Sequence, residues 1–110
     1  MRRFALILVA LATSVQASEW SDLAGDQIRD ALEDRKLTYE SGAWQDFRAS
    51  GRTLYNAGRD SWGSWTVRAD QYCSQWPPST LWACFDIQGH DTGVKFIDEN
   101  GEVTEVRYPD

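Results

Sequence analysis

The segment of residues 62–87 constrains the fold of this chain most strongly, because it holds both cysteines and four of the six tryptophans. Strand-like runs enter and leave this segment, and Cys73 and Cys84 lie within it, separated by ten residues. Trp76, Pro77 and Pro78 interrupt the segment between the two cysteines. We therefore expect a β-hairpin with a long loop and a disulfide between its two strands.

A metal site and a redox site are the other common uses of a cysteine pair. A zinc site usually needs four ligands, and the chain offers His90 as its single histidine beside Cys73 and Cys84. Thioredoxin-type redox pairs are separated by two residues, whereas ten separate these cysteines. The sequence therefore predicts a structural disulfide and no bound metal.

The first residues have the pattern of a secretory signal peptide. A basic start with Arg2 and Arg3 is followed by nine apolar residues at positions 4–12, and small residues precede a cleavage point after Ala17. Nine apolar residues are fewer than half of the roughly 20 that a membrane-spanning helix needs. We expect removal of residues 1–17 on export, and a periplasmic or secreted protein without a membrane anchor.

The net charge of the exported part bears on its partners. Without Arg2 and Arg3 the chain keeps 9 basic residues against 17 acidic residues, a net charge of −8. This sign disfavours nucleic acid and anionic lipid as partners, since both require cationic patches. Residues 18–110, about 93 residues, predict a single disulfide-bonded β-rich domain with a limited core, and we expect a monomer.

Apolar periodicity predicts one helix followed by short strands. From residue 21 to about residue 35, Leu23, Ile28 and Leu32 recur at helical spacing, and Gly25 favours a later start. From Leu37 onward, short runs of β-forming residues are separated by glycine-bearing turns at hairpin spacing. The predicted fold class is α+β, with an N-terminal helix and then a curled antiparallel β-meander of about seven strands. We expect either a small barrel or a two-layer sheet.

Motifs for cofactor binding and nucleophilic catalysis are absent from the sequence. It contains no G-x-G-x-x-G, no G-x-x-x-x-G-K-[ST] and no G-x-S-x-G, and we expect no cofactor. An acid and a base lie close in sequence where His90 is flanked by Asp86 and Asp91. The same residues suit an exposed hairpin turn, so an enzyme that uses His90 with Asp86 or Asp91 is a minor alternative.

Aromatic residues around the disulfide loop are the stronger candidates for a binding site. Tyr72, Trp76, Pro77 and Trp82 cluster there in sequence, and a platform of such rings beside carboxylates and amides suits a sugar ring or a peptide. The competing explanation is that the rings fill the ends of a small barrel and shield the disulfide. We expect that packing role for three other tryptophans, Trp44, Trp62 and Trp65.

The motif YCSQWPPS at residues 72–79, together with Cys84, resembles a motif of small exported bacterial proteins of unknown function. Segments 51–55, 63–67 and 94–97 extend this resemblance over nearly the whole exported part. The resemblance implies a structural role for the motif and supplies no catalytic residues. Some similar sequences carry a dihydrodipicolinate reductase label, but that reaction needs a bound nicotinamide nucleotide, and the motif for one is missing here.

These observations lead to a functional hypothesis with one main rival. We expect a non-enzymatic exported domain that binds a glycan or peptide-like ligand through Tyr72, Trp76, Pro77 and Trp82. In the rival hypothesis, the protein is an inhibitor or interaction module of the cell envelope, and its disulfide-bonded loop enters the cleft of an envelope protein.

Overall fold

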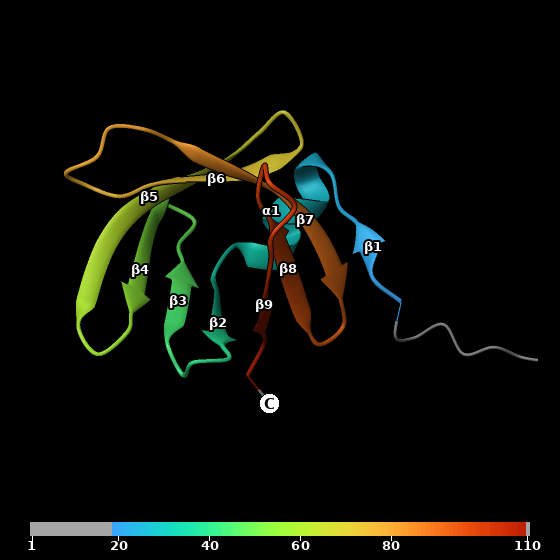
Figure 1. Ribbon diagram of the computed structural model, residues 1–110, viewed down its shortest axis with the longest axis horizontal. Helices are drawn as coiled ribbons and strands as arrows, with labels where there is room; N and C mark the ends of the chain where they lie inside the picture. Colours follow the sequence, from blue (N-terminus) through green and yellow to red (C-terminus); the bar gives the residue numbers. More distant parts are fainter. Residues whose placement is uncertain (1–18, 110) are drawn as a thin grey trace, which may run out of the picture.

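The computed structural model describes residues 19–109, so the expected signal peptide at residues 1–17 lies outside the described part of the chain. Residues 19–109 form nine strands and one helix (Figure 1). In chain order these are β1 (Ser21–Asp22), α1 (Gly25–Leu32), β2 (Arg35–Tyr39), β3 (Trp44–Phe47), β4 (Arg52–Asn56), β5 (Asp60–Arg68), β6 (Gln71–Gln75), β7 (Ala83–His90), β8 (Gly93–Ile97) and β9 (Val103–Arg107).

Eight of the strands, β2 to β9, close into an antiparallel barrel. Each of them pairs with its neighbours in sequence, and β9 pairs back with β2 through Thr38 with Arg107 and Tyr39 with Val106. Strand β1 lies outside this ring and pairs with the end of β7. Closure leaves the barrel without the long unpaired edge that an open sheet exposes.

The predicted α+β fold class is wrong, because the described chain is mostly β, with 53% of its residues in strands and 9% in the helix. The helix begins at Gly25, the later start that the sequence favours, and ends at Leu32, before the predicted end near residue 35. Ser21 and Asp22 pair with β7 as a strand, and Asp34 takes a left-handed conformation (φ 60°) that ends the helical segment before β2. The β2–β9 pairing closes the barrel and thereby excludes the two-layer sheet. This pairing joins segments that are distant in sequence, so local patterns could not predict it.

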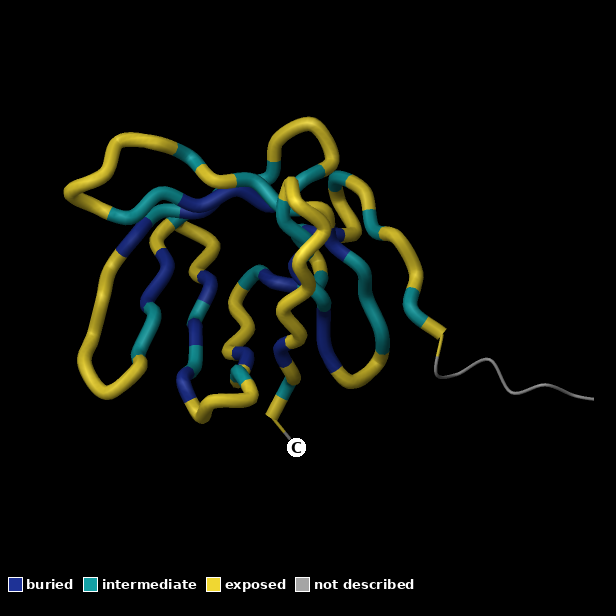
Figure 2. The backbone as a smooth tube through the Cα atoms, viewed as in Figure 1, coloured by how far each residue is buried: buried dark blue, intermediate teal, exposed yellow. Residues whose placement is uncertain are grey.

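Helix α1 plugs one end of the barrel. Its Ile28 and Leu32 are fully buried and pack into a core with Leu37, Trp65 and Val106. Figure 2 shows the buried segments along the strands and the exposed segments at the hairpin loops. Because consecutive loops of such a barrel alternate between its ends, the loops β3–β4, β5–β6 and β7–β8 lie at the plugged end.

Hydrogen bonds from distant parts of the chain hold the helix in place. The Asp70 side chain in the β5–β6 turn accepts a hydrogen bond from the Gly25 amide at 2.9 Å. The Tyr108 hydroxyl, beyond the last strand, donates to the Ala31 carbonyl at 2.8 Å. Both termini of α1 are therefore bonded to the rest of the barrel.

The predicted disulfide is confirmed. Cys73 of β6 and Cys84 of β7 face each other directly in the strand register and are bonded, with 4.0 Å between their Cα atoms. Cys73 is fully buried, and the nearby outward-facing Trp82 is covered by the Arg68 guanidinium. The bond is compatible with an extracellular or periplasmic location.

We predict that removing this bond lowers stability. The variant Cys73→Ala/Cys84→Ala should lose about 2–3 kcal/mol of unfolding free energy, because the bond restricts the unfolded chain by closing a loop of about 12 residues. Urea unfolding measures the difference. The parent protein in dithiothreitol is the matched control and should show a similar loss. An unchanged midpoint in both samples would contradict the prediction.

Candidate functional site

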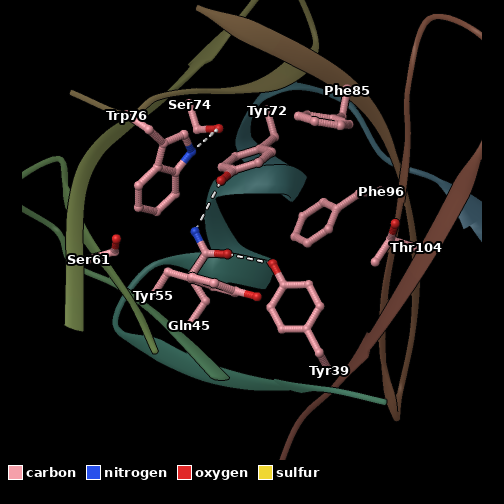
Figure 3. A pocket seen from close by; sticks show the side chains of 10 residues that line it. All are labelled: Tyr39, Gln45, Tyr55, Ser61, Tyr72, Ser74, Trp76, Phe85, Phe96 and Thr104. Carbon is pink, nitrogen blue, oxygen red and sulfur yellow. Dashed lines mark hydrogen bonds between the residues drawn. The ribbon is translucent and has the colours of Figure 1, made fainter. Parts of the chain in front are cut away.

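The open end of the barrel, opposite α1, contains a cavity of about 430 Å³ (Figure 3). It lies among the strand ends next to the loops β2–β3, β4–β5, β6–β7 and β8–β9. Its aromatic lining residues are Tyr39, Tyr55, Tyr72, Trp76, Phe85 and Phe96. Its other lining residues are Gln45, Ser61, Ser74 and Thr104. None of the ten carries a charge, so the cavity is suited to the uncharged part of a ligand.

Packed rings form the floor of the cavity and separate it from the core at the plugged end. Tyr72 stacks on Phe96 with 5.0 Å between ring centroids, and Phe47 meets Tyr72 edge-on at 5.7 Å. Phe85 packs against both Tyr72 and Phe96. Such ring pairs favour offset and edge-on geometry and hold one another in place. The floor is therefore a preformed apolar surface.

A buried amide organises the polar groups of the cavity. Gln45 accepts a hydrogen bond from the Tyr39 hydroxyl at 2.6 Å, and its Nε2 donates to Thr53 at 2.9 Å and to the Tyr72 hydroxyl at 3.2 Å. Thr53 in turn donates to the Asp46 carbonyl at 2.9 Å. Because both ends of the amide have partners, Gln45 can be buried at little cost. Figure 3 shows the hydroxyls of Tyr39 and Tyr72 held toward this amide.

Burial keeps these phenols protonated. It raises the pKa of the Tyr39 hydroxyl, and the nearby Tyr72 and Tyr55 hydroxyls raise it further. Burial also raises the pKa of Tyr72, although hydrogen bonds to Ser74 and Gln45 offset part of this effect. Tyrosine is neutral at physiological pH in any case, so the raised pKa values extend the neutral, hydrogen-bonding form of both groups further into the alkaline range.

Trp76 forms one wall of the cavity just beyond the end of β6. Its indole nitrogen donates to the Ser74 hydroxyl at 3.1 Å, and its ring meets Tyr55 edge-on at 6.2 Å. A Cβ atom at Gly63 would lie 2.6 Å from Cε3 of Trp76. Gly63 is therefore the residue of β5 that leaves room for this indole ring.

Of the four residues predicted for the binding site, two line the cavity and two lie outside it. Tyr72 and Trp76 line the cavity, whereas Pro77 is exposed on the β6–β7 loop. Trp82 lies under the Arg68 guanidinium, 5.0 Å from it, and lines a neighbouring cavity.

Three tryptophans were predicted to pack inside the barrel, and one of them does. Trp65 is buried, with 3% of its surface exposed. Trp62 is 39% exposed and has the guanidiniums of Arg52 and Arg48 at 4.6 and 4.9 Å from its ring. Trp44 is half-buried under Lys36. Trp62 and Trp44 alternate along their strands with inward-facing residues, so they lie on the outer wall.

The cavity residues supplied by β2, β3 and β4 were not predicted from the sequence. Tyr39, Gln45 and Tyr55 come from strands far in sequence from the disulfide loop. The available signal was their position on the inward face of each strand, where a glutamine and tyrosines replace the usual aliphatic residues. These inward-facing residues identify a cavity only when it is known that the strands close into a barrel around one space.

The structure separates Asp86 from His90, whereas His90 and Asp91 line the same cavity at the plugged end. The Asp86 carboxylate accepts a hydrogen bond from Gln71 at 3.0 Å, and His90 lies four residues further along β7, roughly 13 Å away. Nδ1 of His90 accepts from the Thr92 amide at 3.1 Å. Asp91 is exposed in the next turn. These groups lie at the plugged end, away from the aromatic cavity.

Other features of residues 19–109 bear on the choice of function. No group of three or more histidine, cysteine, aspartate or glutamate side chains is placed to hold a metal ion within that range. In the same range, no helix has the length and apolar character needed to cross a membrane.

No protein-family model, curated protein or solved structure matches this chain. The resemblance of its YCSQWPPS motif to small exported bacterial proteins therefore stays a prediction. Functional inference depends on the geometry of the cavity.

We predict that the buried phenols make the protein sensitive to alkali. Unfolded tyrosines ionise near pH 10, whereas Tyr39 and Tyr72 ionise at higher pH when folded. The folded state therefore binds more protons above about pH 10, and stability falls as pH rises, by up to about 1.4 kcal/mol per pH unit for each tyrosine. Urea midpoints measured from about pH 8 to about pH 11 test this.

The control variant for this prediction is Tyr39→Phe. It loses its hydrogen bond to Gln45 and should be less stable by about 1–2 kcal/mol at neutral pH. Its stability should nevertheless fall less steeply in alkali, because one of the two buried hydroxyls is gone. Identical pH slopes for parent and variant would count against the prediction.

Proposed function

We propose that this protein is a non-enzymatic binding domain that holds the uncharged ring of a small ligand in the open end of its barrel. The observation that carries this proposal is the cavity of about 430 Å³, whose ten lining residues are uncharged and largely aromatic. Ligand pockets commonly have volumes of about 300–1,000 Å³. A barrel of eight strands has an interior that is wide enough for one small ligand.

The arrangement of the rings supports a cyclic ligand. Trp76 and Tyr55 meet edge-on at one wall, and the stacked pair of Tyr72 and Phe96 forms the floor. A flat or nearly flat ring can bury its faces against such surfaces without loss of hydrogen bonds. The sugar ring of a glycan and the aromatic side chain of a peptide both meet this requirement. The proposal therefore narrows the hypothesis drawn from the sequence, in which the ligand is a glycan or peptide-like.

The polar groups of the cavity support a ligand with a few hydroxyl or amide substituents. The hydroxyl of Tyr55 has no hydrogen-bond partner among the described residues, and the same is true of the hydroxyls of Ser61 and Thr104 at the exposed rim. These groups can donate or accept. With no cationic residue in the lining, an anionic group would be buried there without a partner.

Two observations support export as part of this proposal. The Cys73–Cys84 bond is stable in oxidising compartments such as the periplasm and the extracellular space. The basic and apolar start of the sequence has the signal-peptide pattern, although those residues lie outside the described part. A ligand-binding domain in that compartment meets small molecules and cell-envelope polymers.

One observation favours the rival function, an interaction module for an envelope protein. Leu81, on the β6–β7 loop beside the disulfide, is 77% exposed, and Pro77 on the same loop is also exposed. An exposed apolar side chain on a loop tip can insert into a partner's cleft. In that case the loop, and not the cavity, would hold the partner.

The binding proposal can be tested with the neutral dye N-phenyl-1-naphthylamine. We expect the dye to bind the parent protein with increased fluorescence, and the variant Ser61→Phe to weaken binding by about tenfold or more, because the new ring occupies the cavity. The matched control is Ser64→Phe, which places the same ring on the outer face of the same strand. The control should bind the dye as the parent does.

Two results would contradict the proposal. One is the absence of dye binding by the parent protein. The other is equal binding by the parent and by Ser61→Phe, which would place the dye outside the cavity. Far-ultraviolet circular dichroism of each variant verifies that the barrel has formed.

A further inference from the structure

A second cavity, of about 520 Å³, adjoins the first at the open end of the barrel. The two cavities share three lining residues, Ser74, Trp76 and Phe85. Trp76 therefore forms part of the wall of both. The two cavities are therefore adjacent, and a ligand larger than one ring could contact both.

The chemistry of the second cavity differs from that of the first. The β6–β7 loop contributes Leu81 and Trp82, and the β8–β9 turn contributes Asp98, Glu99 and Asn100. The lining thus combines apolar surface with two carboxylates and an amide, and it includes no lysine, arginine or histidine. The Arg68 guanidinium lies 5.0 Å from the centroid of the Trp82 ring and is not part of the lining.

The two carboxylates have different roles in the turn. Oδ1 of Asp98 accepts hydrogen bonds from the backbone amides of Asn100 at 2.8 Å and Glu102 at 2.9 Å. Asp98 therefore holds the turn in shape. Glu99 is exposed, and its carboxylate makes no hydrogen bond or ion pair with another described residue. Of the two carboxylates, it is the one that remains available to a ligand.

Resting on the proposed function, we propose that the ligand is a ring compound with a positively charged amine, whose ring occupies the first cavity and whose ammonium group lies beside Glu99 in the second. An uncharged aromatic cavity next to a cavity that bears carboxylates selects for this combination. A cation in the second cavity gains from the Glu99 charge and from the aromatic surface of Trp76. An anionic substituent would meet two carboxylates there, and the Arg68 guanidinium stacked on Trp82 lies outside the lining.

Three indole compounds with short side chains of different charge test this inference. Tryptamine is cationic, tryptophol is neutral and indole-3-acetate is anionic at neutral pH. Calorimetric titration of the parent protein should give tryptamine an affinity about three- to fivefold higher than that of tryptophol. Indole-3-acetate should bind most weakly. The advantage of tryptamine should decrease as salt is added, because the ammonium group remains partly exposed.

The variant Glu99→Gln tests whether the Glu99 carboxylate causes the preference for tryptamine. It should reduce the affinity for tryptamine to the level of tryptophol and leave tryptophol binding unchanged. The matched control is Glu102→Gln, which removes a carboxylate from the same hairpin connection but from a residue that lines neither cavity. This control should keep the preference for tryptamine.

The outcomes separate this inference from the proposed function. If all three indoles bind the parent equally, or if Glu99→Gln keeps the preference for tryptamine, the inference is overturned and the cavity proposal stands. If N-phenyl-1-naphthylamine binds and none of the indoles does, the inference is likewise overturned. If neither the dye nor any indole binds, both proposals fail.

Discussion

The pairing between β2 and β9 is the constraint on which the rest of this structure depends. Only Thr38 with Arg107 and Tyr39 with Val106 pair across this seam, yet these contacts turn a row of hairpins into a ring. Once the ring is closed, inward-facing residues from all the strands surround one space. Tyr39 and Tyr72, from opposite parts of the chain, can then bond to the same amide of Gln45. Without closure the same side chains would lie on one face of an open sheet.

Closure also divides the barrel into two halves with different chemistry. At the plugged end, Ile28 and Leu32 of α1 fill the interior with aliphatic side chains and provide much of the buried apolar surface. At the open end, tyrosine, tryptophan, serine and glutamine line the interior and leave it unfilled. A small domain can leave a cavity unfilled when the remainder of its core is well packed and a disulfide ties two of its strands. The folding core and the proposed binding site are therefore separate parts of one barrel.

Local sequence patterns predicted the parts of the fold that depend on neighbouring residues. The predicted disulfide formed, Trp65 is buried as expected, and Tyr72 and Trp76 both line the cavity. The fold class was wrong because it depended on the length of the helix and on whether the sheet closes. The local periodicity of apolar residues indicates neither the pairing of residues 21–22 with β7 nor that of β2 with β9. For the same reason, the contributions of Gln45 and Tyr55 to the site could not be predicted before the barrel was known.

The bonds that hold α1 in place decide how any occupant can move. Asp70 holds the start of the helix and Tyr108 holds its last turn, so α1 stays seated in the plugged end. In the proposed function, a ligand would therefore enter and leave the barrel by the open end. A second molecule could bind only after the first had departed.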